Sequence, residues 1–159
     1  MASESKIILE LLDQDIQIAT AESCTGGLLA SAFTKYSGIS AIYQTGLVTY
    51  SNESKVRHLK VKPETLNKYG AVSHQVCSQM CFHLAKISKA DLTIATTGVA
   101  GPNGGTPLKP VGLVFAGLYY QKQIYIKKLS FPSNSSRSYI QKGTVKECFQ
   151  MIKEVLDGL

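Results

Sequence analysis

The chain has 159 residues, of which 44% are hydrophobic and 18% charged, and its formal net charge is +6. This length and composition predict one globular domain with a full-sized core, spanning residues 1–159. No run approaches the ~20 apolar residues of a membrane-spanning helix, and residues 1–6 lack a signal-peptide pattern, so we expect a cytoplasmic protein without a membrane partner.

Helical and extended patterns alternate in the first half of the chain. A helix is predicted over residues 5–13 and a buried strand over 16–21. A second helix and a second strand follow over 26–36 and 42–50. Asn52 is predicted to cap a third helix that ends near residue 59.

The second half continues the alternation and then adds a hairpin. A short helix begins at Pro63, and Ser73 is predicted to cap a long helix that ends near residue 88. The remaining predicted elements are, in order, a strand over 92–97, a Gly/Pro loop over 98–110, a hairpin of strands 111–119 and 123–129, and a helix over 135–156.

This order of elements predicts the fold class. Strands that alternate with helices, with one late hairpin, indicate an α/β fold, specifically a three-layer α/β/α sandwich with a mixed, mostly parallel sheet. Binding sites in such sheets lie at the carboxyl ends of the strands. Because Ser23, Tyr50 and Thr97 each follow one of the first three predicted strands, we expect these residues to converge.

The segment Thr20-Ala21-Glu22-Ser23-Cys24-Thr25-Gly26-Gly27 joins the first strand to the next helix. A serine at such a junction lies where backbone N–H groups of the opening helix converge, which favours an oxyanion or a phosphate. An N-cap followed by a tight glycine turn explains the same residues, so the segment alone leaves both interpretations open.

Lys55 is the candidate general base. It follows Tyr50 in the first turn of a predicted helix, and a lysine beside apolar walls or other cations can lose its proton near neutral pH. Taken alone, a solvated helix lysine is the simpler interpretation. His58 and His83 fall in helix patterns and His74 in a cap region, which is more typical of structural or surface histidines.

Cysteines and surface charge suggest neither a metal site nor a nucleic-acid partner. The four cysteines (Cys24, Cys77, Cys81 and Cys148) form no CxxC pair, and buried thiols in a reducing compartment are the favoured interpretation, with Cys24 a possible reactive thiol beside Ser23. The basic residues are scattered, which argues against nucleic-acid binding and is equally suited to attracting a small phosphorylated substrate.

Five sequence blocks occur in order between about residues 19 and 112: AESCTGG, TYSNESK, YGAVS, TTGVAGPNGG and KPVG. Together they resemble the C-terminal domain of the competence/damage-inducible protein CinA, a family that includes stand-alone PncC-type nicotinamide mononucleotide (NMN) deamidases. Arg137, in the last predicted helix, extends the match. The resemblance implies the same α/β/α architecture, and a homodimer or higher homo-oligomer.

The resemblance also implies an activity. It suggests an amidohydrolase of pyridine nucleotide salvage, which hydrolyses the carboxamide of NMN to nicotinate mononucleotide and ammonia without a metal or another cofactor. Ser23 corresponds to the nucleophile, Lys55 to the general base of a Ser–Lys pair, and Tyr50 to a tyrosine that supports proton transfer. The substrate-binding residues that it implies are Glu22, Cys24, Thr25, Gly26, Gly46, Thr97, Gly98, Gly101 and Arg137, with Arg137 suited to the phosphate.

Two other functions fit the same sequence. One is a related amidohydrolase that acts on another carboxamide. The other is a non-catalytic nucleotide-binding or competence-associated protein, although such a protein has no need of a Ser–Lys pair.

Overall fold

The computed structural model describes residues 2–158 and contains, within that range, a five-stranded sheet and six α-helices. The strands are β1 (Ile18–Glu22), β2 (Tyr43–Val48), β3 (Leu92–Gly98), β4 (Leu113–Tyr120) and β5 (Gln123–Ser130). The helices are α1 (Glu4–Asp13), α2 (Leu28–Thr34), α3 (Asn52–Leu59), α4 (Pro63–Tyr69), α5 (His74–Ser88) and α6 (Arg137–Leu156), with a short 3₁₀ helix, η1 (Ile39–Ala41). Every predicted helix and strand is present, with ends shifted by a few residues.

The sheet is mixed and has the strand order β2-β1-β3-β4-β5. β1 pairs in parallel with both β2 and β3, whereas β4 is antiparallel to β3 and to β5. Two of the four strand pairings are therefore parallel and two antiparallel. The three parallel strands end at the same edge of the sheet, which brings the segments that follow them together.

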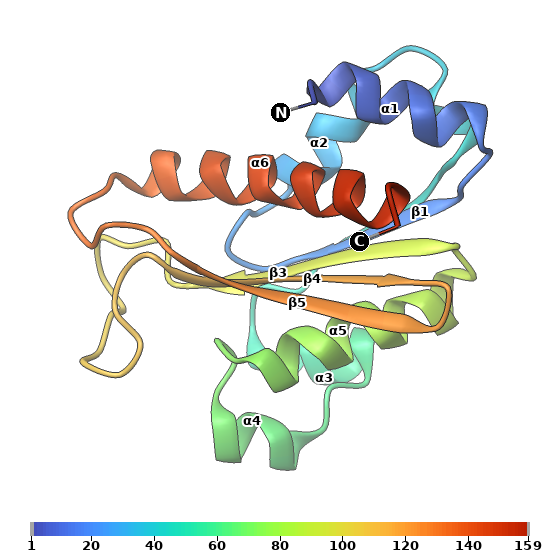
Figure 1. Cartoon of the computed structure of the whole chain (residues 1–159). Helices are drawn as coiled ribbons and strands as arrows, with labels where there is room; N and C mark the ends of the chain where they lie inside the picture. The colour runs from blue at the N-terminus through green and yellow to red at the C-terminus, as the bar shows by residue number, and fades with distance from the viewer. Residues whose placement is uncertain (1, 159) are drawn as a thin grey trace.

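Helices cover both faces of the sheet, as the sequence predicts for a three-layer α/β/α fold. Figure 1 shows α1, α2 and α6 on one face, and α3, α4 and α5 on the other. β1 is buried along its whole length because it lies between two neighbouring strands and between two helical layers.

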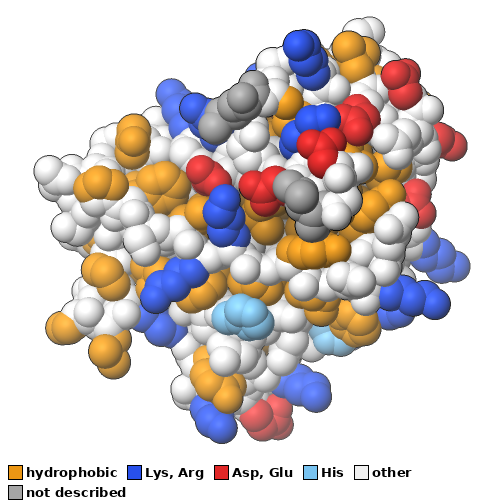
Figure 2. Space-filling view, viewed as in Figure 1, with side chains coloured by type: hydrophobic (Ala, Val, Ile, Leu, Met, Phe, Trp, Pro, Cys, Tyr) orange, Lys and Arg blue, Asp and Glu red, His pale blue; other side chains and the backbone are white. Residues whose placement is uncertain are grey.

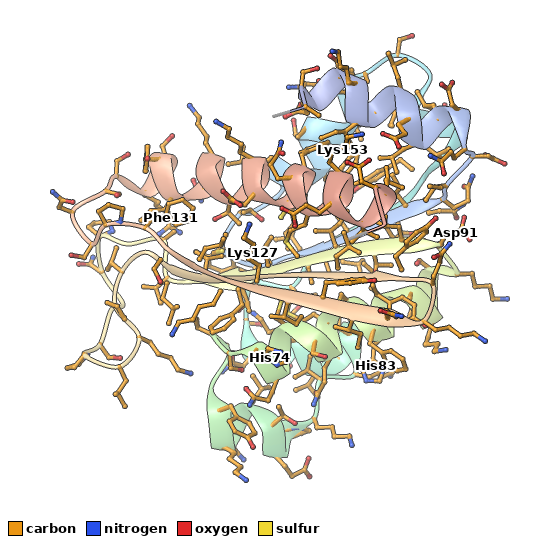
Figure 3. All side chains as sticks on the ribbon, in the orientation of Figure 1. His74, His83, Asp91, Lys127, Phe131 and Lys153 are labelled. Carbon is orange, nitrogen blue, oxygen red and sulfur yellow. The ribbon has the colours of Figure 1, made fainter. Side chains whose placement is uncertain are left out.

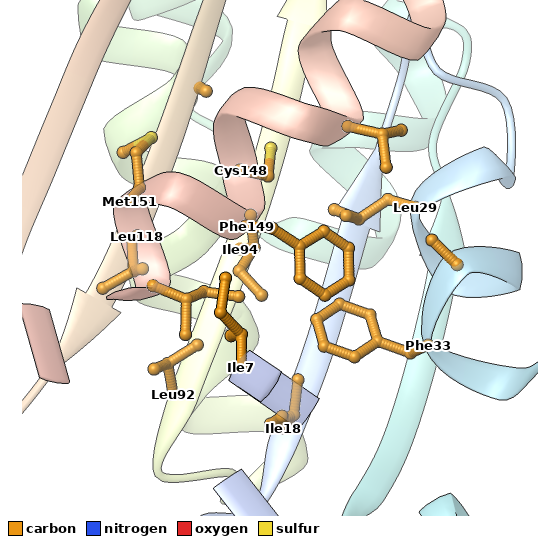
Figure 4. Packing of buried hydrophobic residues seen from close by; sticks show 14 of the residues in the cluster. Ile7, Ile18, Leu29, Phe33, Leu92, Ile94, Leu118, Cys148, Phe149 and Met151 are labelled. Carbon is orange, nitrogen blue, oxygen red and sulfur yellow. The ribbon is translucent and has the colours of Figure 1, made fainter. Parts of the chain in front are cut away.

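The core on the α6 face is built from large apolar side chains. The rings of Phe33 on α2 and Phe149 on α6 lie 4.8 Å apart between centroids, and Ile7 and Leu29 are buried in the same cluster (Figure 4). Burial of each such side chain contributes about 1.5–3 kcal/mol to folding. These contacts fix α2 and α6 against the sheet, and both helices begin at the edge where β1 ends.

The face of the molecule viewed in Figure 2 has no concentrated basic surface. Figure 2 shows Lys and Arg side chains at many separate places on that face, with acidic side chains between them. None of the helices in residues 2–158 is both long enough and apolar enough to cross a membrane.

Candidate active site

A cavity of about 290 Å³ lies where β1, β2 and β3 end. Eight of the predicted site residues line it: Ser23, Cys24, Tyr50, Lys55, Thr97, Gly98, Gly101 and Arg137. Seven further residues line the cavity: Val99 and Ala100, which lie in the turn between the predicted residues Gly98 and Gly101, and Asn52, Ala71, Val72, Asn103 and Gly104, which the sequence had not assigned to a site. All seven lie within the five sequence blocks, and membership of a block is the sequence feature that could have predicted them as site residues.

Ser23 is placed by the end of β1 and the turn that follows it. Its backbone N–H donates to the carbonyl of Thr96 at 3.0 Å, which extends the β1–β3 pairing by one residue. Gly26 and Gly27 then adopt φ values of +57° and +107°, a left-handed conformation that reverses the chain into α2 with little steric cost. The side chain of Ser23 is only 8% exposed and opens into the cavity.

Lys55 extends from α3 into the same cavity. The helix begins with a cap from Ser51, whose Oγ accepts a hydrogen bond from the Ser54 N–H at 3.0 Å. The prediction that Asn52 is the cap was therefore wrong by one residue: Asn52 is the first helical residue, and it lines the cavity. From this helix the Lys55 side chain runs inward and is 1% exposed.

The amine of Lys55 meets three oxygen atoms. Its Nζ lies 2.9 Å from Ser23 Oγ, 2.8 Å from the carbonyl oxygen of Thr49 and 3.4 Å from that of Tyr50. Burial disfavours the ammonium form and lowers the pKa of Lys55 to about 8, because a charge loses hydration in the interior. The Ser–Lys pairing that the sequence suggested is therefore present as a buried contact.

Tyr50 and Arg137 form a second pair, at the rim of the cavity. Arg137 Nη2 donates to the Tyr50 hydroxyl at 2.7 Å, and Arg137 Nη1 donates to the carbonyl of Gly101. Tyr50 is 60% exposed, and only its backbone carbonyl reaches Lys55. Its hydroxyl is therefore held by Arg137, not by the Ser23–Lys55 pair, so the geometry does not provide the proton-transfer role implied for this tyrosine.

Four predicted substrate-binding residues do not line the cavity: Glu22, Thr25, Gly26 and Gly46. The Glu22 carboxylate instead accepts hydrogen bonds from the N–H groups of Leu29 and Ala30, at the start of α2. Gly46 lies within β2, where an added Cβ would stand 2.5 Å from the Tyr43 hydroxyl. Its small size serves close packing inside the sheet.

Backbone N–H groups in the turn beside the cavity are suited to stabilise an anion. In the turn after Ser23, the Gly26 N–H donates to the Ser23 carbonyl at 3.1 Å and is occupied. Cys24 lines the cavity and Thr25 follows it in the turn, and the N–H groups of both donate to no acceptor on another residue among residues 2–158. These two amides are therefore the candidate oxyanion donors.

Other titratable groups are poorly suited to be the nucleophile or the base. Burial raises the pKa of the Cys24 thiol to about 12, so it remains protonated and unreactive near neutral pH, contrary to the possibility raised by its position. No histidine lines the cavity within the described part of the chain. His74 and His83 lie on α5, on the face of the sheet opposite α6 (Figure 3).

A larger cavity, of about 520 Å³, lies elsewhere, between α1, α2 and α6. Its floor includes Ala32, Val145 and Phe149, and Lys142 and Lys146 also line it. It contains none of the residues that converge at the ends of the parallel strands, so the smaller cavity is the candidate active site.

Comparison with known proteins gives a consistent result. The model of the CinA C-terminal domain family matches residues 1–156. A putative competence-damage inducible protein of Clostridium novyi is 45% identical over 146 residues, which cover 92% of this chain and 35% of that protein. A protein of the same description from Clostridium botulinum strain Okra is 46% identical over 154 residues, covering 97% of this chain and 37% of that one. The chain thus spans about a third of the length of these curated relatives.

Solved structures share the fold. The competence/damage inducible protein CihA from Agrobacterium tumefaciens superposes with a TM-score of 0.91 at 37% identity, covering 95% of this chain and 92% of that one. The competence damage-inducible protein A (ComA) from Klebsiella pneumoniae gives 0.91 at 31% identity, with 99% of each chain covered. The chain belongs to the CinA C-terminal domain family.

Proposed function

We propose that the protein is an amidohydrolase that deamidates nicotinamide mononucleotide, with Ser23 as nucleophile and Lys55 as general base. The observation that carries the proposal is the buried contact of 2.9 Å between Lys55 Nζ and Ser23 Oγ at a cavity wall. A nucleophile and a base within hydrogen-bond distance are what covalent catalysis by a serine requires.

The surroundings of Lys55 aim its lone pair at Ser23. A neutral amine has two N–H donors and one lone pair, and the carbonyls of Thr49 and Tyr50 only accept hydrogen bonds. When Lys55 is neutral, its two N–H groups therefore point to these carbonyls, and its lone pair faces the Ser23 hydroxyl. The same geometry lets the protonated form return a proton to the leaving group.

The reaction then follows in balanced steps. The Ser23 proton passes to Lys55 as Oγ bonds to the carboxamide carbon, and the amides of Cys24 and Thr25 stabilise the resulting oxyanion. As the C–N bond breaks, Lys55 returns the proton to the nitrogen and ammonia leaves. Water then attacks the acyl-Ser23 ester, and Lys55 accepts a proton from it. As the bond between Oγ and the acyl carbon breaks, Lys55 returns this proton to Ser23 Oγ, and the carboxylic acid product loses its proton to solvent.

Arg137 supports a nucleotide as the substrate. Two of the five N–H donors of its guanidinium bind Gly101 and Tyr50, which orients the group at the cavity rim, and donors remain for a phosphate. The cavity is of small-molecule size and holds two side-chain amides, Asn52 and Asn103, that are suited to polar recognition.

A substrate panel tests this function against amidase activity on another carboxamide. Ammonia release would be measured with NMN, nicotinamide riboside and nicotinamide. We expect NMN to have the highest kcat/KM, and Arg137→Met to reduce it by about 10-fold or more for NMN while changing that for the riboside little. Equal turnover of all three compounds would contradict the nucleotide assignment, and release only from other carboxamides would support the related amidohydrolase.

A further inference from the structure

A hydrogen-bonded network of buried side chains lies behind the turn that carries Ser23. It consists of Glu22, Thr25 and Thr96, all of them buried. Thr25 Oγ1 lies 2.6 Å from Glu22 Oε1 and 2.8 Å from Thr96 Oγ1, and Thr96 Oγ1 lies 3.4 Å from the backbone N of Ser23. The network therefore connects the backbone N–H of Ser23 to the carboxylate of Glu22.

The direction of these hydrogen bonds follows from what each group can donate. A carboxylate oxygen only accepts, so the single hydroxyl hydrogen of Thr25 is directed to Glu22. Thr25 must then accept from Thr96, whose hydroxyl hydrogen is directed to it. Thr96 Oγ1 is left as an acceptor on the side of the Ser23 N–H, which also donates to the Thr96 carbonyl at 3.0 Å.

Glu22 connects this network to helix α2. Its Oε1 also accepts from the N–H of Leu29 at 2.8 Å, and its Oε2 accepts from that of Ala30 at 3.0 Å. These N–H groups belong to the first turn of α2, where a carboxylate is favoured by the helix dipole. One carboxylate thus ties the start of α2 to Thr25 and, through Thr25, to β3.

We infer that Glu22, Thr25 and Thr96 act as positioning residues for Ser23 and for the amides of Cys24 and Thr25. The turn from Ser23 to Thr25 is held at one end by β3 and at the other by the Thr25 side chain, so its two free amides have a fixed direction. None of the three side chains lines the cavity, so none contacts the substrate. The inference rests on the proposed function only in taking Ser23 as the nucleophile.

The central test is Thr25→Val, which removes the middle hydroxyl while preserving side-chain size and the backbone amide. We expect kcat for NMN to fall by about 10- to 100-fold, with KM changed less than about threefold, because misplaced reacting groups slow the chemical step more than binding. The pH midpoint of kcat/KM should not move, because the contacts of Lys55 remain. Thr25→Ser restores the hydroxyl and should recover most of the activity.

Thr93→Val is the matched control. Thr93 is also a buried threonine with one hydrogen bond, to the carbonyl of Cys81, but it lies near the other end of β3. This variant should keep wild-type kcat even if its melting temperature falls as far as that of Thr25→Val. Thr96→Val leaves the hydrogen bond between Thr25 and Glu22 intact and removes the one between Thr96 and Thr25. It provides a second way to interrupt the network if Thr25→Val does not fold.

Labelling of Ser23 by a fluorophosphonate probe separates this inference from the proposed function. We expect the labelling rate of Thr25→Val to fall in parallel with kcat. A wild-type protein that is labelled but releases no ammonia from NMN would refute the substrate, and the labelling rates would still decide the positioning role. Equal rates for wild type and Thr25→Val, or an equal loss in Thr93→Val, would overturn the inference, and a wild type that is neither labelled nor active would overturn both.

Discussion

At the scale of single residues, the site depends on where one lysine is buried. Lys55 lies under two backbone carbonyls and against Ser23, in a place where an ammonium ion is poorly hydrated. A lysine on the surface of the same helix would remain protonated near neutral pH and would not accept a proton from serine. The identity of Lys55 as a candidate base was accessible from its sequence block, but its burial was not.

The lowered pKa of Lys55 predicts the pH dependence of the reaction. Because the neutral amine is the base and its pKa is about 8, kcat/KM should rise about tenfold per pH unit below pH 8 and level off above it. Initial rates measured between pH 6 and 10, with a control for protein stability, would test this. A rate that falls as pH rises from 7 to 9 would rule out a neutral lysine base. Lys55→Arg should be inactive throughout, because arginine stays protonated.

Side-chain direction explains why one prediction at this scale did not match the structure. The family resemblance placed Glu22, which precedes Ser23 in the sequence, among the substrate-binding residues. Consecutive residues of an extended chain point to opposite sides, and Glu22 is the last residue of β1, so its carboxylate points towards α2 while Ser23 faces the cavity. Hydrogen bonds such as that between Thr25 and Thr96, which are 71 residues apart, could not be read from spacing.

At the scale of elements, three candidate site residues lie near the starts of helices: α2 and α3 follow the parallel strands β1 and β2, whereas α6 follows β5, which is antiparallel to its neighbour. Ser23 precedes α2, Lys55 lies in the first turns of α3, and Arg137 is the first residue of α6. Strand and helix patterns predicted this arrangement because apolar periodicity and glycine turns are local signals. The helix caps were less predictable, because Ser51 and Asn52 are both good capping residues and only backbone geometry distinguishes them.

The caps of α3 provide a prediction at this scale. Ser51→Ala should lower the free energy of unfolding by about 1 kcal/mol, because the Ser54 N–H loses its acceptor. Asn52→Ala should cost much less stability and instead raise KM, since Asn52 lines the cavity. Urea denaturation and steady-state kinetics of the two variants would check both. The reverse pattern, in which Asn52→Ala is the destabilising change, would show that the cap is Asn52.

At the scale of the whole molecule, the sequence was sufficient for the architecture and for the convergence of three strand ends. The mixed sheet, the two helical layers and the matches to CinA-family structures agree with it. What remained hidden were contacts between distant segments, such as the bond from Gln141 on α6 to the Cys24 carbonyl, which links the last helix to the turn after Ser23. Such contacts depend on how α6 packs across the sheet, which short-range patterns in the sequence do not predict.

Ammonia release from NMN by the purified protein tests the central claim most directly, with Ser23→Ala as the matched variant. The account predicts one ammonia and one nicotinate mononucleotide per turnover in the wild type. In Ser23→Ala, whose melting temperature should stay near that of the wild type, both products should be lost. No release from a well-folded wild-type protein, or undiminished release from Ser23→Ala, would contradict the account.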